Sequence, residues 1–89
     1  MRMMDDSVLA RVHRVVVRTA GATRTPPDPG PDTPLGEAGF WLDSVDLVEV
    51  IVACEEEFGV TFDGETDLTP ETLATVRSLA ALIRSKGGR

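Results

Sequence analysis

The stretch that decides the fold is residues 42–60, which read LDSVDLVEVIVACEEEFGV. Asp43 or Ser44 can cap the start of a helix through a side-chain oxygen, and Gly59 is the residue type that most often ends one. Between these limits, apolar residues recur at spacings of three and four, as on one face of a helix. The stretch therefore predicts a helix over residues 43–58, and its boundaries are the clearest in the chain.

Two faces of this predicted helix are apolar. At about 100° per residue, one apolar stripe is centred on Cys54. This stripe contains Leu47, Val50, Ile51, Cys54 and Phe58. Its position predicts that the Cys54 thiol is buried and structural. A helix that only covers a core has a polar opposite face, whereas here three valines cluster on a second face and acids flank them. That face predicts a docking surface for basic partners, unless the preceding loop covers it. The predicted partner surface consists of Val45, Asp46, Val48, Glu49, Val52, Glu55 and Glu56.

The rest of the chain predicts further helices and one long loop. Apolar periodicity predicts helices over residues 5–20 and 75–86, and Thr69 followed by Pro70 predicts a short helix over residues 69–74. Five of the six prolines fall within residues 26–34, so residues 21–42 are expected to be irregular. The later part of this loop, Leu35 and residues 40–42, is apolar enough to pack on the core. The expectation is a single all-α domain over residues 1–89, a bundle of three main helices and one short helix.

The amino-acid composition excludes several classes of function. Nine basic and fifteen acidic side chains give a net charge of −6, which disfavours binding to nucleic acid or to an anionic membrane. One cysteine cannot form an internal disulfide, and a reducing cytoplasm is expected. With one histidine and one cysteine in the core stripe, no catalytic constellation and no metal site are expected. The chain is expected to act as a monomer that meets basic protein partners.

Ser44 is the residue that best fits a chemical role. At the first position of a helix, unpaired N–H groups and the helix dipole stabilise an attached anion by about 0.3–1 kcal/mol. Asp43 and Asp46 oppose a phosphodiester there by repulsion, although Asp43 could help hold a divalent cation against the phosphate during its transfer. Taken alone, an Asp-Ser pair before an apolar helix is more often an ordinary cap.

The wider pattern resembles the acyl carrier protein family. The resemblance rests on residues 42–51, on residues 55–60 and on the apolar pattern of residues 75–83, around the signature Asp43-Ser44-Val45. It implies a four-helix fold without an active site of its own, in which Ser44 carries 4'-phosphopantetheine and Asp43 assists. It also implies two kinds of partner: a phosphopantetheinyl transferase that uses coenzyme A, and acyl-loading, condensing or modifying enzymes with basic docking surfaces.

Departures from the family pattern bear on the pathway. Val45 replaces the usual leucine, and the approach to the motif over residues 39–43 is longer and more aromatic than in fatty-acid carriers. These features resemble discrete carriers of polyketide or other specialised pathways. The Gly-Gly-His-Ser signature of many peptidyl carriers is absent, but aminoacyl carriers with an Asp-Ser motif exist. An aminoacyl or peptidyl carrier therefore stays an alternative, as does an unmodified helical interaction module in which Ser44 only caps.

Overall fold

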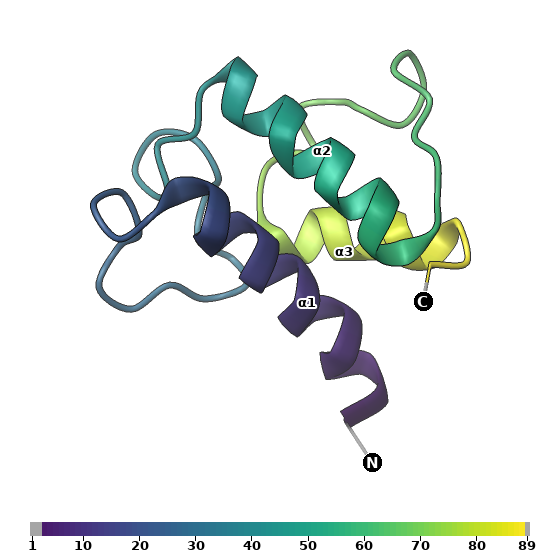
Figure 1. Cartoon of the computed structure of the whole chain (residues 1–89), viewed down its shortest axis with the longest axis horizontal. Coiled ribbons are helices and arrows are strands. Elements are labelled where there is room, and N and C mark those ends of the chain that lie inside the picture. The colour runs from purple at the N-terminus through teal and green to yellow at the C-terminus, as the bar shows by residue number, and fades with distance from the viewer. Residues whose placement is uncertain (1–2, 89) are drawn as a thin grey trace.

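The described part of the chain folds into three helices joined by long irregular segments. The computed structural model describes the backbone of residues 3–88 and the side chains of residues 8–88. Its helices are α1 (Met3–Ala20), α2 (Ser44–Phe58) and α3 (Val76–Ser85) (Figure 1). Within this part of the chain there is no strand, only an isolated antiparallel bridge between Pro34 and Thr75, and no helix is long and apolar enough to cross a membrane. The predicted all-α class is confirmed.

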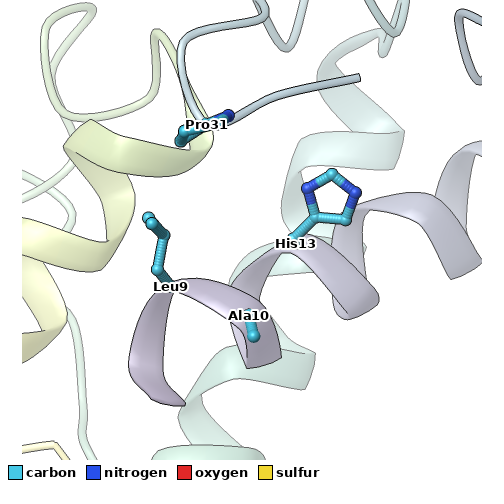
Figure 2. Close-up of a pocket in the computed structure, with 4 residues that line it drawn as sticks. All are labelled: Leu9, Ala10, His13 and Pro31. Atoms are coloured by element: carbon cyan, nitrogen blue, oxygen red, sulfur yellow. The ribbon is translucent and has the colours of Figure 1, made fainter. Parts of the chain in front are cut away.

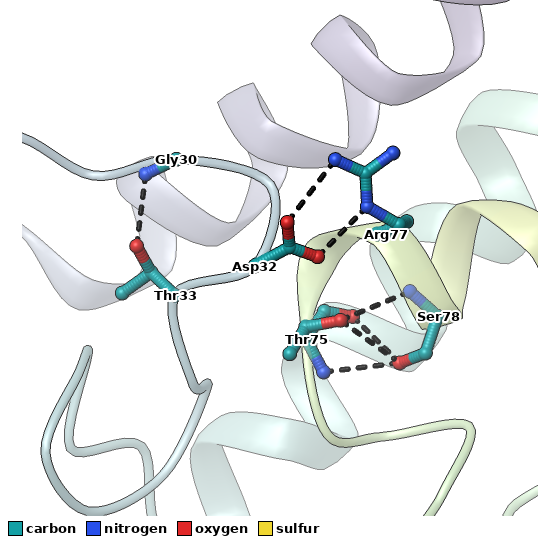
Figure 3. A network of polar contacts seen from close by, with 6 residues as sticks. All are labelled: Gly30, Asp32, Thr33, Thr75, Arg77 and Ser78. Carbon is teal, nitrogen blue, oxygen red and sulfur yellow. Dashed lines mark hydrogen bonds and ion pairs between the residues drawn. The ribbon is translucent and has the colours of Figure 1, made fainter.

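Helices α2 and α3 begin and end within one residue of the predicted ranges because local side chains fix their ends. Asp43 is the N-cap of α2 and forms a reciprocal capping box with Asp46. Gly59 ends α2 in the left-handed conformation, with a φ of 66°. Thr75 caps α3 through an equivalent box with Ser78 (Figure 3). Helix α1 begins at Met3, two residues before the predicted range of 5–20, so residues 5–7 lie inside the helix and do not cap it.

Residues 69–74 form turns instead of the predicted short helix, so residues 3–88 contain three helices and not the predicted four. One helical hydrogen bond is present, from the Leu73 N–H to the Thr69 carbonyl oxygen at 3.0 Å. The Thr72 hydroxyl donates to the Asp67 carbonyl oxygen at 2.6 Å, and such local side-chain bonds compete with helix propagation. Because Thr75 already caps the next helix, the segment has room for a single turn only.

The core lies where α1 packs against both α2 and α3, which contact each other much less (Figure 1). Side chains from the loop between α1 and α2 complete this core. Leu35 and Phe40 are 0% exposed, and Leu42 is also buried. The other buried apolar residues are Val12, Val15, Val16, Ala20, Val50, Ile51, Cys54, Phe58, Phe62, Val76, Leu79, Ala80 and Ile83.

Backbone hydrogen bonds hold the second half of the loop in place. The Leu35 N–H donates to the Ala74 carbonyl oxygen at 2.9 Å, just before α3. The Phe40 N–H donates to the Pro34 oxygen at 3.0 Å, and the Leu42 N–H donates to the Leu35 oxygen at 2.9 Å. The start of α2 is therefore tied to the segment before α3, and the prediction that Leu35, Phe40 and Leu42 pack on the core is confirmed.

Trp41 departs from that prediction, because its side chain is 58% exposed. Its neighbours Phe40 and Leu42 both take inward positions, which leaves the intervening side chain outside. The backbone at Trp41 is left-handed, with a φ of 57°, and its N–H donates to the Gly36 carbonyl oxygen at 2.8 Å. The prediction that residues 40–42 pack inward as a unit is wrong at Trp41.

The first half of the loop is also attached to α3, through contacts that the sequence did not indicate. Arg77 donates its backbone N–H to the Pro31 carbonyl oxygen at 2.8 Å. The Arg77 guanidinium pairs with the Asp32 carboxylate at 2.7 and 3.2 Å, as Figure 3 shows. A short turn precedes this pair, in which the Gly30 N–H donates to the Thr33 hydroxyl oxygen at 2.8 Å.

Replacing Phe40 with alanine should lower the free energy of unfolding by about 3–5 kcal/mol, since a fully buried ring leaves a cavity between helices. Urea denaturation followed by circular dichroism measures the change. The matched control is Val48→Ala, at a position 61% exposed, which should change stability by less than about 0.5 kcal/mol. Equal stability of Phe40→Ala and wild type would show that the loop does not contribute to the core.

Candidate functional site

Ser44 is the first residue of α2 and is exposed to solvent. Within residues 8–88, its hydroxyl takes part in no side-chain hydrogen bond. The first backbone N–H groups of a helix have no partner inside the helix, so the hydroxyl stands at a position of positive potential. Ser44, the predicted site residue, is therefore accessible, and its hydroxyl is free of side-chain hydrogen bonds within residues 8–88.

The residues on either side of Ser44 hold one another in a fixed geometry. Asp43 Oδ1 accepts a hydrogen bond from the Asp46 N–H at 2.9 Å. In return, Asp46 Oδ2 accepts from the Asp43 N–H at 3.1 Å. Ser44 and Val45 lie inside this closed loop of bonds, so the start of α2 is not expected to fray.

Arg24 connects the end of α1 to the start of α2. Its guanidinium donates to both carboxylate oxygens of Asp46, at 2.6 and 3.4 Å. The same group donates to the carbonyl oxygens of Ala20 at 3.1 Å and Thr19 at 3.2 Å. These are the last carbonyls of α1, which have no partner within the helix. One side chain therefore caps α1 and holds the N-terminal turn of α2.

This contact also sets the electrostatics of the site. The hydrogen bonds from Arg24, and next the bond from the Asp43 N–H, lower the pKa of Asp46 from 3.8 to about 2. The same hydrogen bond raises the pKa of Arg24. Both groups are therefore charged at neutral pH, and Arg24 offsets one of the two acids that flank Ser44. An anion on Ser44 meets less repulsion than the sequence alone suggests.

The valines of the predicted partner surface are all exposed: Val45 by 66%, Val48 by 61% and Val52 by 47%. Glu49 and Glu56 are exposed as well. The loop does not cover these side chains, which was the alternative explanation for the second apolar face.

Two acids of the predicted partner surface are engaged inside the molecule. The Asp46 side chain is only 15% exposed and pairs with Arg24. Glu55 Oε2 accepts a hydrogen bond from the Phe62 N–H at 2.9 Å. Their part in docking stays a prediction, but these contacts leave them less available than Glu49 and Glu56.

Cys54 lies in the core, as the stripe on α2 predicts. It is 0% exposed, and burial, followed by the charge of Glu57, raises the pKa of its thiol to about 12. A thiol with such a pKa is almost entirely protonated at neutral pH and reacts slowly. Cys54 is therefore no candidate for carrying a substrate.

A small apolar hollow of about 310 Å³ lies between α1 and the following loop, lined by Leu9, Ala10, His13 and Pro31 (Figure 2). The His13 and Phe40 rings also pack at nearly a right angle, with ring centroids 6.3 Å apart. The described residues contain no group of three histidine, cysteine or acidic side chains suited to a metal ion.

Arg24 is the site residue that the sequence analysis missed. A signal was present, because Arg24 is the only basic residue between Arg18 and Arg77, in the part of the chain that holds most of the acids. A lone cation in such surroundings suggests an ion pair. The pattern alone does not say which acid it meets, since Asp46 lies 22 residues away.

The family model described as the phosphopantetheine attachment site matches residues 10–83. The chain belongs to this family. It is therefore a phosphopantetheine carrier with no catalytic site of its own, and its cofactor is covalently bound 4'-phosphopantetheine. The predicted family and cofactor are confirmed, and the family implies a phosphopantetheinyl transferase and enzymes that act on the loaded carrier. No solved structure matches this carrier at a significant level.

Replacing Asp46 with asparagine should lower the melting temperature of the carrier at neutral pH but make little difference near pH 2. The folded-state pKa of Asp46 is depressed, so its charge stabilises the fold above the ordinary pKa of 3.8. That contribution is lost as the pH falls through about 2. Thermal unfolding at a series of pH values should show the difference between the two proteins shrinking below about pH 4.

The matched control is Asp28→Asn, an exposed carboxylate in the loop between α1 and α2, which should shift the melting temperature little at any pH. A difference between wild type and Asp46→Asn that stays constant down to pH 2 would show that the charge of Asp46 does not stabilise the fold.

Proposed function

We propose that Ser44 is the residue that carries the 4'-phosphopantetheine arm. The observation that carries this proposal is an exposed, uncommitted serine hydroxyl at the first position of α2, inside the region that matches the family. The surroundings fit a phosphodiester, because the helix start offers unpaired N–H groups and Arg24 neutralises Asp46 at 2.6 Å. When bound, the arm supplies a terminal thiol that holds an acyl group as a thioester.

The transfer needs little from the carrier beyond an accessible nucleophile. Ser44 Oγ forms a bond to the phosphorus that carries pantetheine in coenzyme A, and the bond to adenosine 3',5'-bisphosphate breaks. The hydroxyl proton passes to a base of the transferase. Asp43 can assist by binding the divalent cation that neutralises the phosphates. Its Oδ1 accepts the Asp46 N–H, and Oδ2 has no hydrogen-bond partner within residues 8–88.

The loaded carrier presents acyl intermediates to successive enzymes, and we place it in polyketide or other specialised metabolite biosynthesis. Support for this pathway class comes from the long loop of residues 21–43, with its prolines and its aromatic approach to Ser44. Tethering raises the effective concentration of the thioester at each bound enzyme. An enzyme that adenylates amino acids and loads this carrier would favour the aminoacyl alternative.

The exposed part of α2 is the surface that these partners would meet. Val45, Val48 and Val52 form an apolar ridge, and Glu49 and Glu56 stand exposed beside it. A basic partner surface with an apolar centre complements both features. Since charge acts over several ångströms in water, these acids should speed association more than they tighten the complex.

Incubating the carrier with coenzyme A, Mg²⁺ and a promiscuous phosphopantetheinyl transferase should add one phosphopantetheine mass to the intact protein. The modified form should also gain one fast-reacting thiol, because Cys54 is buried with its pKa raised to about 12. Intact mass spectrometry and a thiol-reagent assay measure the two results.

Two serine variants make this test specific to Ser44. Ser44→Ala should gain no mass, whereas Ser85→Ala, which removes another exposed serine hydroxyl, should be modified like wild type. A mass gain that survives Ser44→Ala would place the arm elsewhere. A wild-type carrier of unchanged mass would remove the proposed attachment site.

Reversing the charge of Glu49 and Glu56 to lysine should slow association with a basic partner enzyme and flatten its dependence on salt concentration. Stopped-flow association rates at several ionic strengths measure the effect. The control Glu37→Lys/Glu71→Lys changes the net charge by the same amount at exposed positions outside α2, and its salt dependence should stay closer to that of wild type. An equal effect of both double variants would attribute the result to net charge alone.

A further inference from the structure

Trp41 occupies a backbone position that suits glycine and not tryptophan. Its φ is 57°, in the left-handed region where a bulky side chain is an outlier. Such strain is kept only where the surroundings impose the conformation or a function uses it. Here the backbone is fixed by the buried neighbours Phe40 and Leu42 and by the hydrogen bond to the Gly36 carbonyl oxygen at 2.8 Å.

The indole contributes little to the core in return for this strain. Trp41 is 58% exposed and is the largest of the exposed hydrophobic side chains. Glycine would adopt the same backbone without strain and would expose no large apolar surface. The fold accounts for the conformation at residue 41, but it does not account for a tryptophan there.

The position of Trp41 indicates which molecule covers it. Trp41 lies three residues before Ser44, which limits their Cα atoms to about 11 Å apart. Enzymes that act on the loaded carrier reach a thiol at the far end of a long arm. The transferase alone must bring its reacting phosphorus into contact with Ser44 Oγ. An interface of ordinary size covers 20–30 residues on each side, so the transferase footprint around Ser44 includes Trp41.

We propose that Trp41 is an aromatic anchor for the phosphopantetheinyl transferase, with its indole seated in an apolar recess beside that enzyme's basic surface. The proposal rests on Ser44 as the attachment residue. Tryptophan is one of the residue types enriched among the positions that contribute most binding energy at protein interfaces. The exposed valine nearest in sequence, Val45 at 66%, extends the same apolar contact onto α2, and Glu49 supplies charge complementary to a basic partner.

The test measures the rate of phosphopantetheine transfer to Trp41→Gly at varied carrier concentration. We expect the KM for the carrier to rise about tenfold or more, with kcat changed less than about threefold, because the serine and the transferase chemistry are untouched. The melting temperature of Trp41→Gly should equal or exceed that of wild type, since glycine relieves the strain.

The matched control is Ala38→Gly. Ala38 is exposed and left-handed, with a φ of 70°, so this variant also relieves strain in the same loop but leaves Trp41 in place. It should raise the melting temperature and leave KM unchanged. Trp41→Phe should have a KM for the carrier close to that of wild type. An unchanged KM for Trp41→Gly would overturn the proposal, and so would a large fall in its melting temperature, which would make Trp41 a structural residue.

Fluorine NMR can detect the contact between Trp41 and the transferase directly. The chain has one tryptophan, so carrier labelled with 5-fluorotryptophan gives one indole signal. In the Ser44→Ala background, adding unlabelled transferase with coenzyme A should shift or broaden that signal. A signal that moves only when the arm is attached to the wild-type carrier would assign Trp41 to its own arm and overturn the proposal. A wild-type carrier that gains no mass refutes the attachment site instead, so the two failures are distinguishable.

Discussion

The burial of three loop side chains between the helices is the constraint on which this fold depends. Because α2 and α3 contact each other little, side chains from outside the helices help to complete the core. Leu35, Phe40 and Leu42 belong to the core cluster and are removed from water there. The loop between α1 and α2, which looks like a linker in the sequence, supplies three of the sixteen buried apolar residues among the described residues.

The same constraint positions the site. Because Leu42 is buried next to Asp43, the first turn of α2 begins at a fixed point on the core. Gly39 permits this path, since a Cβ there would collide with the Pro34 carbonyl oxygen. Arg24 supplies a second attachment from the end of α1, at 2.6 Å from Asp46. Ser44 is thus exposed on a rigid base, which suits a residue that must be reached by another enzyme.

Features set by neighbouring residues could be predicted from the sequence, and features set by distant contacts could not. A cap at Asp43 or Ser44, a helix end at Gly59 and a core stripe around Cys54 each depend on residues within one or two turns of each other. The structure has Asp43 as the cap and Gly59 at the end of the helix, and the stripe is buried except for Leu47, which is partly buried. Arg24 and the outward turn of Trp41 depend on how the loop packs. The prediction of a short helix over residues 69–74 was wrong because the Thr72 side chain hydrogen-bonds to the nearby backbone. Helix propensity does not tell which of the two arrangements forms.

Ion pairing within the molecule leaves two exposed acids of α2, Glu49 and Glu56, available to a partner. Four basic side chains pair with acids within the described residues: Arg11 with Glu57, Arg24 with Asp46, Arg77 with Asp32 and Lys86 with Asp67. In the same part of the chain, Glu49 and Glu56 form no ion pair. The net charge of −6 therefore includes two exposed acids beside the valine ridge. Their field extends about 10 Å at 0.1 M salt, so a basic partner meets it before the ridge makes contact, and charge can orient an encounter that apolar burial then completes.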